Sequence, residues 1–271
     1  MSVLEAIILG AVQGLTEFLP VSSSGHLVLL HSLFINVHTE SDLLFDVFLH
    51  LATLFALLIY FRKDILYLIK GCIGMGSSSD EEKKKARILS VVLIVATIPA
   101  GLIGFFLKDI IEISVRNNGI VAIALIVGSI ILFFADYVEK RIAEKKELHI
   151  RNGLLIGLLQ SCALIPGMSR SGMSIAGGFF VGLSRKESVR FAFLLAIPLV
   201  ASAGILGIHD AMGSSTLAFD FSSLIIGSIT AFIVGIGAIH FLLRFLRHHS
   251  LMPFIIYRVV LALIIFISLG I

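Results

Sequence analysis

Two short segments of this chain combine charged and hydroxyl side chains with helix-breaking glycine and proline. The first covers residues 14–26, GLTEFLPVSSSGH, and the second covers residues 166–172, PGMSRSG. Together they supply a carboxylate, a histidine, an arginine and five serines. Guanidinium and hydroxyl groups donate hydrogen bonds to phosphate oxygens, while a carboxylate or an imidazole accepts protons or binds cations. The two segments are therefore candidates for an anion-binding, phosphate-handling site.

Glu17 is the acidic group of the first segment, and Gln13 precedes it by four residues. On a helix these two side chains share one face, one turn from the serines at 22–24. A carboxylate at membrane depth is costly and is functional by default. The alternative is an ion pair with Arg170 that only holds the two segments together, and a purely structural amide is equally open for Gln13. His50, on the next expected helix, is a further candidate to approach the site.

His26 follows the serine and glycine run, at the expected start of a second short helix. The positive end of the helix dipole favours a neutral imidazole there, and a neutral imidazole can act as a base or as a nucleophile. A lone histidine is more often structural, but its place beside three serines favours the functional reading. Ser22, Ser23 and Ser24 cannot all be nucleophiles, so at least two of them are expected to cap the helix or to donate to phosphate.

Arg170 lies between Ser169 and Ser171 in the second segment. Its guanidinium can hold phosphate oxygens through two parallel hydrogen bonds, and the neighbouring N–H and hydroxyl groups complete an anion-binding concavity. We expect the two segments to meet inside the bilayer, with Glu17 and His26 facing Arg170 across a space large enough for a diphosphate.

The composition identifies the setting of these segments as a membrane. The chain has 271 residues, of which 58% are hydrophobic and 14% charged, and its mean hydropathy is +1.05. Ordinary soluble domains are only about 45–50% apolar. The net charge of +3 is small, and the basic residues lie in loops, which argues against a nucleic-acid partner. Two distant cysteines imply neither a disulfide framework nor a metal framework.

The apolar runs predict an all-α, polytopic membrane protein that forms a single domain over residues 1–271, with six transmembrane helices and two re-entrant helical hairpins. A proline at position 20 should end a helix over residues 3–19, and the second helix of that hairpin is expected from Leu27. The hairpins are predicted at about 3–34 and 152–182. The six spans are predicted at about 44–61, 88–107, 119–136, 189–208, 222–243 and 254–270.

The basic residues predict the orientation. If both hairpins turn back without crossing, 18 of the 21 Lys and Arg residues fall on one side of the membrane. They lie in the loops 62–87, 137–151, 184–190 and 244–258. By the positive-inside rule this side is cytoplasmic, so both termini are expected outside the cell.

An internal repeat supports the same arrangement. A shift of 147 residues superposes five identical pairs, which are Gly10 on Gly157, Gln13 on Gln160, Ser22 on Ser169, Ser24 on Ser171 and Gly25 on Gly172. Repeat 1 covers about 1–136 and repeat 2 about 152–271. Because three spans separate the two hairpins, the second copy enters from the opposite face, which makes the repeat inverted. Transporters use such repeats to bring two interrupted helices together near the midplane.

The two segments resemble the corresponding elements of the undecaprenyl-diphosphate phosphatase family, the integral-membrane type linked to bacitracin resistance. QGLTEFLPVSSSGH and PGMSRSG occur in the family's order, and the likeness extends over essentially the whole chain. The resemblance implies an enzyme of the plasma membrane that hydrolyses a polyprenyl diphosphate to the monophosphate and inorganic phosphate. This reaction recycles the lipid carrier for the synthesis of peptidoglycan and other cell-envelope glycans.

The resemblance also assigns roles to residues. It implies catalytic roles for Glu17, His26, Ser23 and Arg170, and a divalent ion, Mg²⁺ or Ca²⁺, held by Glu17 with Gln13. Many relatives carry a second glutamate where this chain has Gln13, so the claim of two metal-binding carboxylates is weakened here. Whether His26, Ser23 or water attacks stays open. The residues expected to bind the diphosphate are Ser22, Ser24, Gly25, Ser169, Ser171 and Gly172.

A second class of function also fits this architecture, namely a secondary transporter or flippase of an anionic lipid. Fold alone does not separate an enzyme from a transporter. A transporter is expected to carry several membrane-embedded carboxylates, whereas Glu17 is the clearest one here. The sequence leaves the oligomeric state open, a homodimer included.

Overall fold

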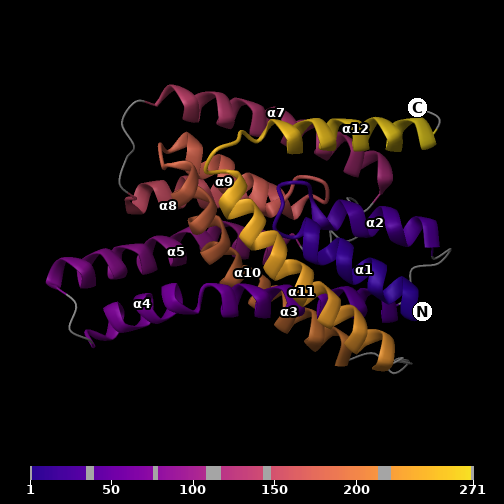
Figure 1. Ribbon diagram of the computed structural model, residues 1–271, viewed down its shortest axis with the longest axis horizontal. Helices are drawn as coiled ribbons and strands as arrows, with labels where there is room; N and C mark the ends of the chain where they lie inside the picture. The colour runs from indigo at the N-terminus through magenta and orange to yellow at the C-terminus, as the bar shows by residue number, and fades with distance from the viewer. Residues whose placement is uncertain are drawn as a thin grey trace.

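The computed structural model describes residues 2–34, 40–75, 79–107, 117–142, 148–212 and 221–269. All regular secondary structure within these ranges is helical, which confirms the prediction of an all-α protein. The first helix begins and the last helix ends at the same end of the molecule's long axis (Figure 1).

Each half of the chain opens with a pair of short helices. The first pair is α1 (Val3–Thr16) and α2 (Ser23–Phe34), and the second is α8 (Ile150–Ser161) and α9 (Arg170–Phe180), with a 3₁₀ turn over Cys162–Leu164 between them. The other helices are α3 (Glu40–Tyr60), α4 (Arg62–Ile73), α5 (Asp80–Phe106), α7 (Asn118–Arg141), α10 (Arg185–Met212), α11 (Phe221–Phe245) and α12 (Met252–Ser268).

Four of these helices, α5, α7, α10 and α11, are long and apolar enough to cross a membrane. They coincide with four of the predicted spans. The apolar part of α3 coincides with a fifth, but it bends by 70° at Phe61 into α4, so the two helices form a fifth span only if they are taken together. The sixth predicted span corresponds to α12, a shorter apolar helix of 17 residues that is not among the clear spans. The structure thus supports a multi-pass membrane protein with four or five clear spans.

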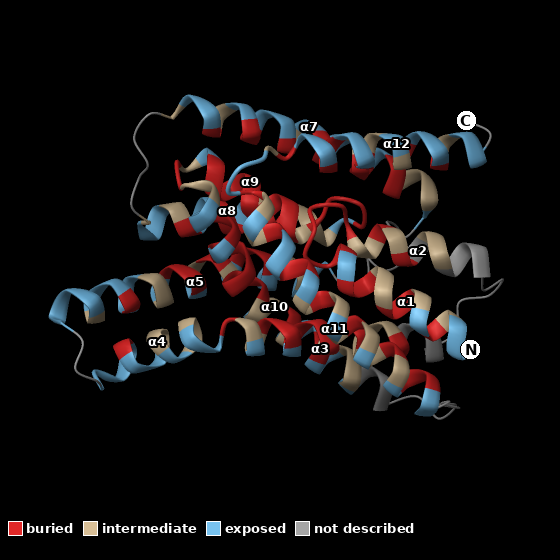
Figure 2. Ribbon diagram, viewed as in Figure 1, coloured by how far each residue is buried: buried red, intermediate tan, exposed pale blue. Residues whose placement is uncertain are grey.

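The long helices expose large apolar side chains along their outer faces. Leu102 on α5, Ile130 on α7 and Ile233 on α11 are all exposed. In Figure 2 exposed residues line the outside of α7 and α12, while buried residues concentrate at the centre of the molecule. A soluble protein rarely exposes such continuous apolar surface, whereas lipid tails cover it without cost.

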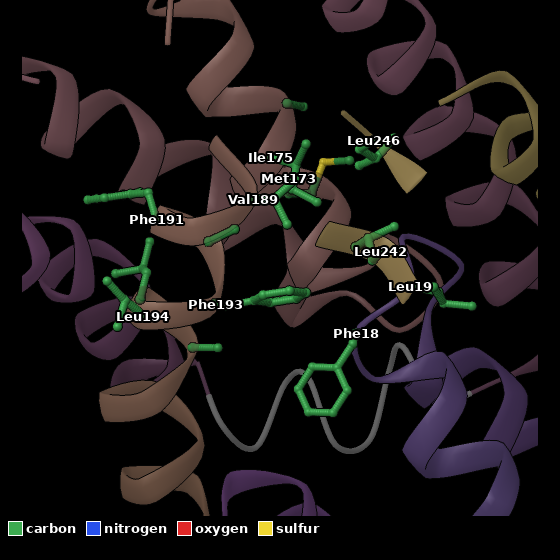
Figure 3. Close-up of a cluster of buried hydrophobic side chains, with 14 of the residues drawn as sticks. Phe18, Leu19, Met173, Ile175, Val189, Phe191, Phe193, Leu194, Leu242 and Leu246 are labelled. Atoms are coloured by element: carbon green, nitrogen blue, oxygen red, sulfur yellow. The ribbon is translucent and has the colours of Figure 1, made fainter. Parts of the chain in front are cut away.

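The core lies beneath the two short helix pairs. Phe18, from the turn after α1, packs edge to face against Phe193 of α10, with ring centroids 5.6 Å apart. Met173 and Ile175 of α9 are fully buried in the same cluster, and Leu242 of α11 closes it (Figure 3). Aromatic and branched side chains from both halves of the chain therefore pack against one another next to the turns.

The first helix of each pair packs against a long helix from the other half. Helix α1 runs along α11, and α8 runs along α5. Glycines permit this approach, since a Cβ at Gly10 would clash with the carbonyl of Gly227, and a Cβ at Gly157 would clash with that of Ala96. Small residues at helix contacts are the usual means of close packing in membranes. Gly10 and Gly157 are a repeat pair, so the sequence repeat corresponds to a reciprocal packing.

Candidate active site

Residues 14–26 form the first break, at the junction of α1 and α2, and residues 166–172 form the second break, at the start of α9. Glu17 lies in the first break, directly after α1. This helix ends at Thr16 rather than at Leu19, and the N–H of Glu17 donates to Gln13 O at 2.9 Å. Helix α2 begins at Ser23, four residues before the predicted start. The chain leaves helical geometry before Pro20 because a proline disfavours helical backbone at the residue that precedes it. Glu17 is thereby carried to the edge of the turn, where it is only 5% exposed.

Ser22 and Ser169 occupy equivalent positions in the two breaks. They are the two non-glycine residues with positive φ in the described part of the chain, at 76° and 74°. Each hydroxyl accepts from the backbone N–H three residues later, Gly25 at 3.3 Å and Gly172 at 3.2 Å. A positive φ is unfavourable for a residue with a Cβ, and such strain clusters at functional sites. The pairs predicted by the 147-residue shift are therefore equivalent in backbone geometry.

The two breaks contact each other directly. The N–H of Gly167 donates to Ser22 Oγ at 3.1 Å, and Ser171 Oγ donates to the carbonyl of Leu19 at 3.0 Å. These residues are about half the chain apart in sequence. The predicted contact between the two segments is therefore present.

Glu17 is the centre of the polar contacts between them. Its Oε1 accepts from Arg170 Nη2 in a buried ion pair. Its Oε2 accepts from Gln13 Nε2 at 3.0 Å and from Ser23 Oγ at 2.6 Å. His50 Nε2 lies 3.7 Å from the same oxygen. Three other predicted site residues, and His50 as a fourth, thus surround one carboxylate.

Glu17 and Arg170 are in direct contact, which differs from the space predicted between them. A buried carboxylate without a partner is strongly destabilising, and pairing with a guanidinium removes that cost. The ion pair considered as the structural alternative is therefore present. It does not exclude a catalytic role, because the guanidinium can exchange one anionic partner for another.

His26 has other partners. Its Nδ1 lies 2.7 Å from the carbonyl of Ser22 and its Nε2 lies 2.6 Å from the hydroxyl of Tyr257 on α12. The two rings are stacked, at 5° and 5.6 Å between centroids. None of the contacts described for His26 joins it to Glu17 or Arg170. The structure therefore places His26 in the first break but outside the Glu17 cluster.

Arg258 is a residue that the sequence reading missed. It was grouped with the charges of a cytoplasmic loop, but its side chain is fully buried. Its guanidinium donates to carbonyls of both breaks, those of Pro20, Gly167 and Met168 at 3.0–3.3 Å. It also donates to Ser129 Oγ and to backbone carbonyls of α7. One arginine thus fixes both turns, and the predicted cytoplasmic loops hold one positive charge fewer.

The sequence did contain a signal for the burial of Arg258, because this residue lies within the apolar run MPFIIYRVVLALIIF. Charged side chains in a membrane segment point inward and pair. Tyr257, the residue before it, carried no comparable signal. Its partner His26 lies at the opposite end of the chain, so only the packed structure connects the two.

The oxygen of Gln13 bears on the predicted metal. Gln13 Oε1 is buried and has no hydrogen-bond partner in the part of the chain that the structure describes. Amide oxygens and carboxylates are the ligands that Mg²⁺ and Ca²⁺ prefer, and Mg²⁺ is commonly held by one or two carboxylates together with substrate phosphates. Gln13 and Glu17 fit such a shared ion once Arg170 has left Glu17 and the Gln13 amide, whose Nε2 now faces the carboxylate, has turned its oxygen toward it. They do not fit a cation site closed by protein alone, since the described residues contain no group of three His, Cys, Asp or Glu ligands.

Comparison with known proteins identifies the family of this chain. Residues 6–264 match the family model described as bacitracin resistance protein BacA. The chain is 41% identical over 272 residues to the undecaprenyl-diphosphatase of Mycolicibacterium smegmatis, covering 100% of this chain and 98% of that protein. It is 37% identical to the undecaprenyl-diphosphatase of Marinobacter nauticus, covering 98% of both chains. It is 36% identical to undecaprenyl-diphosphatase 1 of Pseudoalteromonas translucida, covering 99% of this chain and all of that one.

Proposed function

This chain belongs to the bacitracin resistance protein BacA family, and from that premise we infer that it hydrolyses undecaprenyl diphosphate to undecaprenyl phosphate and inorganic phosphate. It is a membrane-embedded hydrolase, and its product is the lipid carrier used in cell-envelope glycan synthesis. The names of the relatives favour this activity over the transporter or flippase that the architecture also allowed.

The observation that carries the proposal for the site is the contact between the two breaks around Glu17. Arg170 stands at the first position of α9 and Ser23 at the first position of α2. The starts of two helices thus converge, each with unpaired N–H groups and a positive dipole end that favour an anion. We propose that the diphosphate binds there, with Arg170 shifting its hydrogen bonds from Glu17 to a phosphate oxygen. The hydroxyls of Ser22, Ser24 and Ser169 would supply further donors. The Ser171 hydroxyl and the N–H groups of Gly25 and Gly172 would first have to leave their present acceptors.

Within this site the residues have separate tasks. Glu17 orients the Ser23 hydroxyl through their 2.6 Å hydrogen bond. His26 stands three residues after Ser23 on α2, so the two side chains share a helix face. We propose that His26 accepts the proton of the attacking hydroxyl or water, because Nδ1–H is engaged by Ser22 O and leaves the lone pair on Nε2. Arg170 stabilises the charge that grows on the phosphate oxygens.

We propose that a divalent ion, Mg²⁺ or Ca²⁺, is shared between the protein and the diphosphate. Glu17 and Gln13 Oε1 would hold it, the latter being the buried oxygen without a partner. When bound, such an ion neutralises phosphate charge as a Lewis acid. Gln13 contributes no charge, so the affinity for the ion in the free protein should be modest.

The proposed topology is six spans and two re-entrant hairpins in an inverted repeat, with both termini outside the cell. Three features support it: the equivalent turns at Ser22 and Ser169, the reciprocal packing of α1 on α11 and of α8 on α5, and the start of α1 and the end of α12 at one end of the molecule (Figure 1). The described site lies within one chain, so a homodimer, if it forms, is not required to complete it. Labelling of single cysteines near His26 in intact cells tests the orientation. Access only to a reagent applied from the cytoplasm would contradict it.

The test of the function is phosphate release from undecaprenyl diphosphate by the purified protein, with and without a chelator. We expect release that depends on a divalent ion and is abolished in Glu17→Ala and Arg170→Ala. Movement of the lipid between leaflets without any hydrolysis would contradict the assignment. Hydrolysis unaffected by the chelator would contradict the metal alone.

A further inference from the structure

Tyr257 is the partner of His26, and no role has been assigned to it so far. Its hydroxyl lies 2.6 Å from His26 Nε2, and its ring stacks on the imidazole. The tyrosine comes from α12, while the histidine comes from α2 at the other end of the chain. Its side chain is 46% exposed, so the ring is only partly packed and is not a core anchor.

The direction of this hydrogen bond follows from the other nitrogen. Nδ1 lies 2.7 Å from the carbonyl oxygen of Ser22, and a carbonyl can only accept. Nδ1 therefore carries a proton, and in the neutral ring Nε2 carries the lone pair. The hydroxyl of Tyr257 donates to that lone pair. The basic nitrogen of His26 is consequently covered by the phenol.

Arg258 fixes the position of this phenol. It follows Tyr257 directly on α12, and its guanidinium is held by the carbonyls of Pro20, Gly167 and Met168. The helix cannot rotate or slide without breaking these bonds in the buried centre. The backbone that carries the tyrosine is thus tied to the same turns that form the candidate site.

We propose that Tyr257 positions His26 and passes it the proton taken from the attacking group. This inference rests on the proposed function, since it deepens the role given there to His26. A proton reaches Nε2 either through the tyrosine oxygen or after the tyrosine has moved away. The anchored backbone and the stacked rings favour transfer through the oxygen.

The transfer balances without any further reactant. The attacking water, or Ser23 once its hydroxyl has turned away from Glu17 Oε2, gives its proton to Oη of Tyr257 as the original phenolic proton moves to His26 Nε2. One O–H bond breaks and one forms on the tyrosine, so Tyr257 ends neutral while His26 becomes an imidazolium. The negative charge left on the attacking oxygen goes into the new bond to phosphorus. As that bond forms, the bridging P–O bond of the diphosphate breaks, and its electron pair stays on the leaving phosphate. His26 then returns its proton through Oη to this leaving phosphate, which restores the resting state.

The first test is Tyr257→Phe, which keeps the stacked ring and removes only the hydroxyl. We expect kcat for undecaprenyl diphosphate to fall by about tenfold or more, because a positioned proton transfer contributes roughly 10²–10⁴-fold, with KM unchanged. A matched control is Tyr137→Phe on α7, since Tyr137 is exposed to the same fraction, 46%, and lies outside the site. A rise in kcat for Tyr257→Phe would show that the phenol merely blocks His26 and would overturn the proposal.

A double-mutant cycle shows whether Tyr257 acts through His26. We expect the double variant His26→Gln with Tyr257→Phe to be no slower than His26→Gln alone. Independent, multiplied losses would overturn the relay. If His26→Gln is active, the role of His26 as a base in the proposed function is contradicted. If His26→Gln is inactive but Tyr257→Phe is fully active, only the relay through Tyr257 is overturned.

Nitrogen-15 spectra of the histidine rings provide a readout that does not depend on activity. In the wild-type protein we expect His26 to carry its proton on Nδ1, with a hydrogen-bonded Nε2. Tyr257→Phe should shift the Nε2 resonance alone. An unchanged Nε2 resonance in a folded variant would also overturn the proposal.

Discussion

The two breaks have the same backbone conformation at equivalent positions but carry different side chains. Ser22 and Ser169 have the same unusual φ and the same hydrogen bond to a glycine N–H. At the next position the first break has Ser23 and the second has Arg170, and both side chains donate to Glu17. Two equivalent helix starts thus converge on one acidic group.

Glu17 has no acidic counterpart at the equivalent position of the second break. The 147-residue shift relates Glu17 to Leu164 and His26 to Met173. The second break therefore supplies the positive charge and the first supplies the carboxylate and the imidazole. Two helix starts of equivalent backbone geometry thus converge, and the different side chains that they carry make one asymmetric site. This comparison can be tested by changing one break at a time.

The largest effect is expected from separating Glu17 and Arg170. Glu17→Ala or Arg170→Ala should each lower kcat by about a thousandfold, at the upper range for loss of one charge-stabilising group. Each should also cost about 3–5 kcal/mol of stability, because a buried charge is left without its partner. The double variant should regain thermal stability without regaining activity. Leu164→Ala at the equivalent position of the second break is the control, and substantial phosphate release by either single variant would refute the asymmetry.

The next effect concerns the group that joins the two breaks. A Cβ at Gly128 would clash with the guanidinium of Arg258, so Gly128→Ala should destabilise the protein by about 1–3 kcal/mol, as overpacking does. Activity should fall as well, because both turns lose a fixed anchor. Gly237→Ala is the matched control, since nothing lies within 4 Å of its added Cβ. Equal melting temperatures for the two variants would argue against the anchoring role.

A smaller effect is expected from the two buried glutamines. Gln13 and Gln160 are a repeat pair, but only Gln13 lies against Glu17. Gln13→Glu should lower the Mg²⁺ concentration for half-maximal activity by about tenfold, since ligand charge sets the affinity for hard cations. Gln160→Glu should leave that concentration unchanged and destabilise the protein. A titration of activity against Mg²⁺ gives the result, and identical shifts in both variants would contradict a metal at the first break.

The smallest effect should distinguish the two serine caps. Ser169→Ala should cost about 1 kcal/mol, the usual loss of an N-cap hydroxyl. Ser22→Ala should cost about 1 kcal/mol more, because its Oγ also accepts the N–H of Gly167 across the interface between the breaks. Thermal unfolding in detergent measures both. A greater loss for Ser169→Ala would mean that the inter-segment bond adds nothing.

Much of this molecule could be predicted from local sequence patterns. The long apolar runs gave four spans at their observed positions, and the serine and glycine segments marked both breaks. The helix ends were less accurate. Helix α1 ends at Thr16, three residues before the predicted end at Leu19, and Glu17 is its C-cap and contacts the second segment.

The sequence by itself determined the membrane class, the family and the equivalence of Ser22 and Ser169, because hydropathy and helix-breaking residues act over a few neighbours. Only the tertiary structure decided that Glu17 contacts Arg170 directly, that Arg258 holds both turns, and that Tyr257 covers His26. These contacts join segments remote along the chain, and those of Arg258 and Tyr257 depend on how α12 packs against α7. A charge that is buried away from water must be paired or hydrogen-bonded. Its partners are therefore the polar groups that the packed structure brings close, even where these lie far away in the sequence.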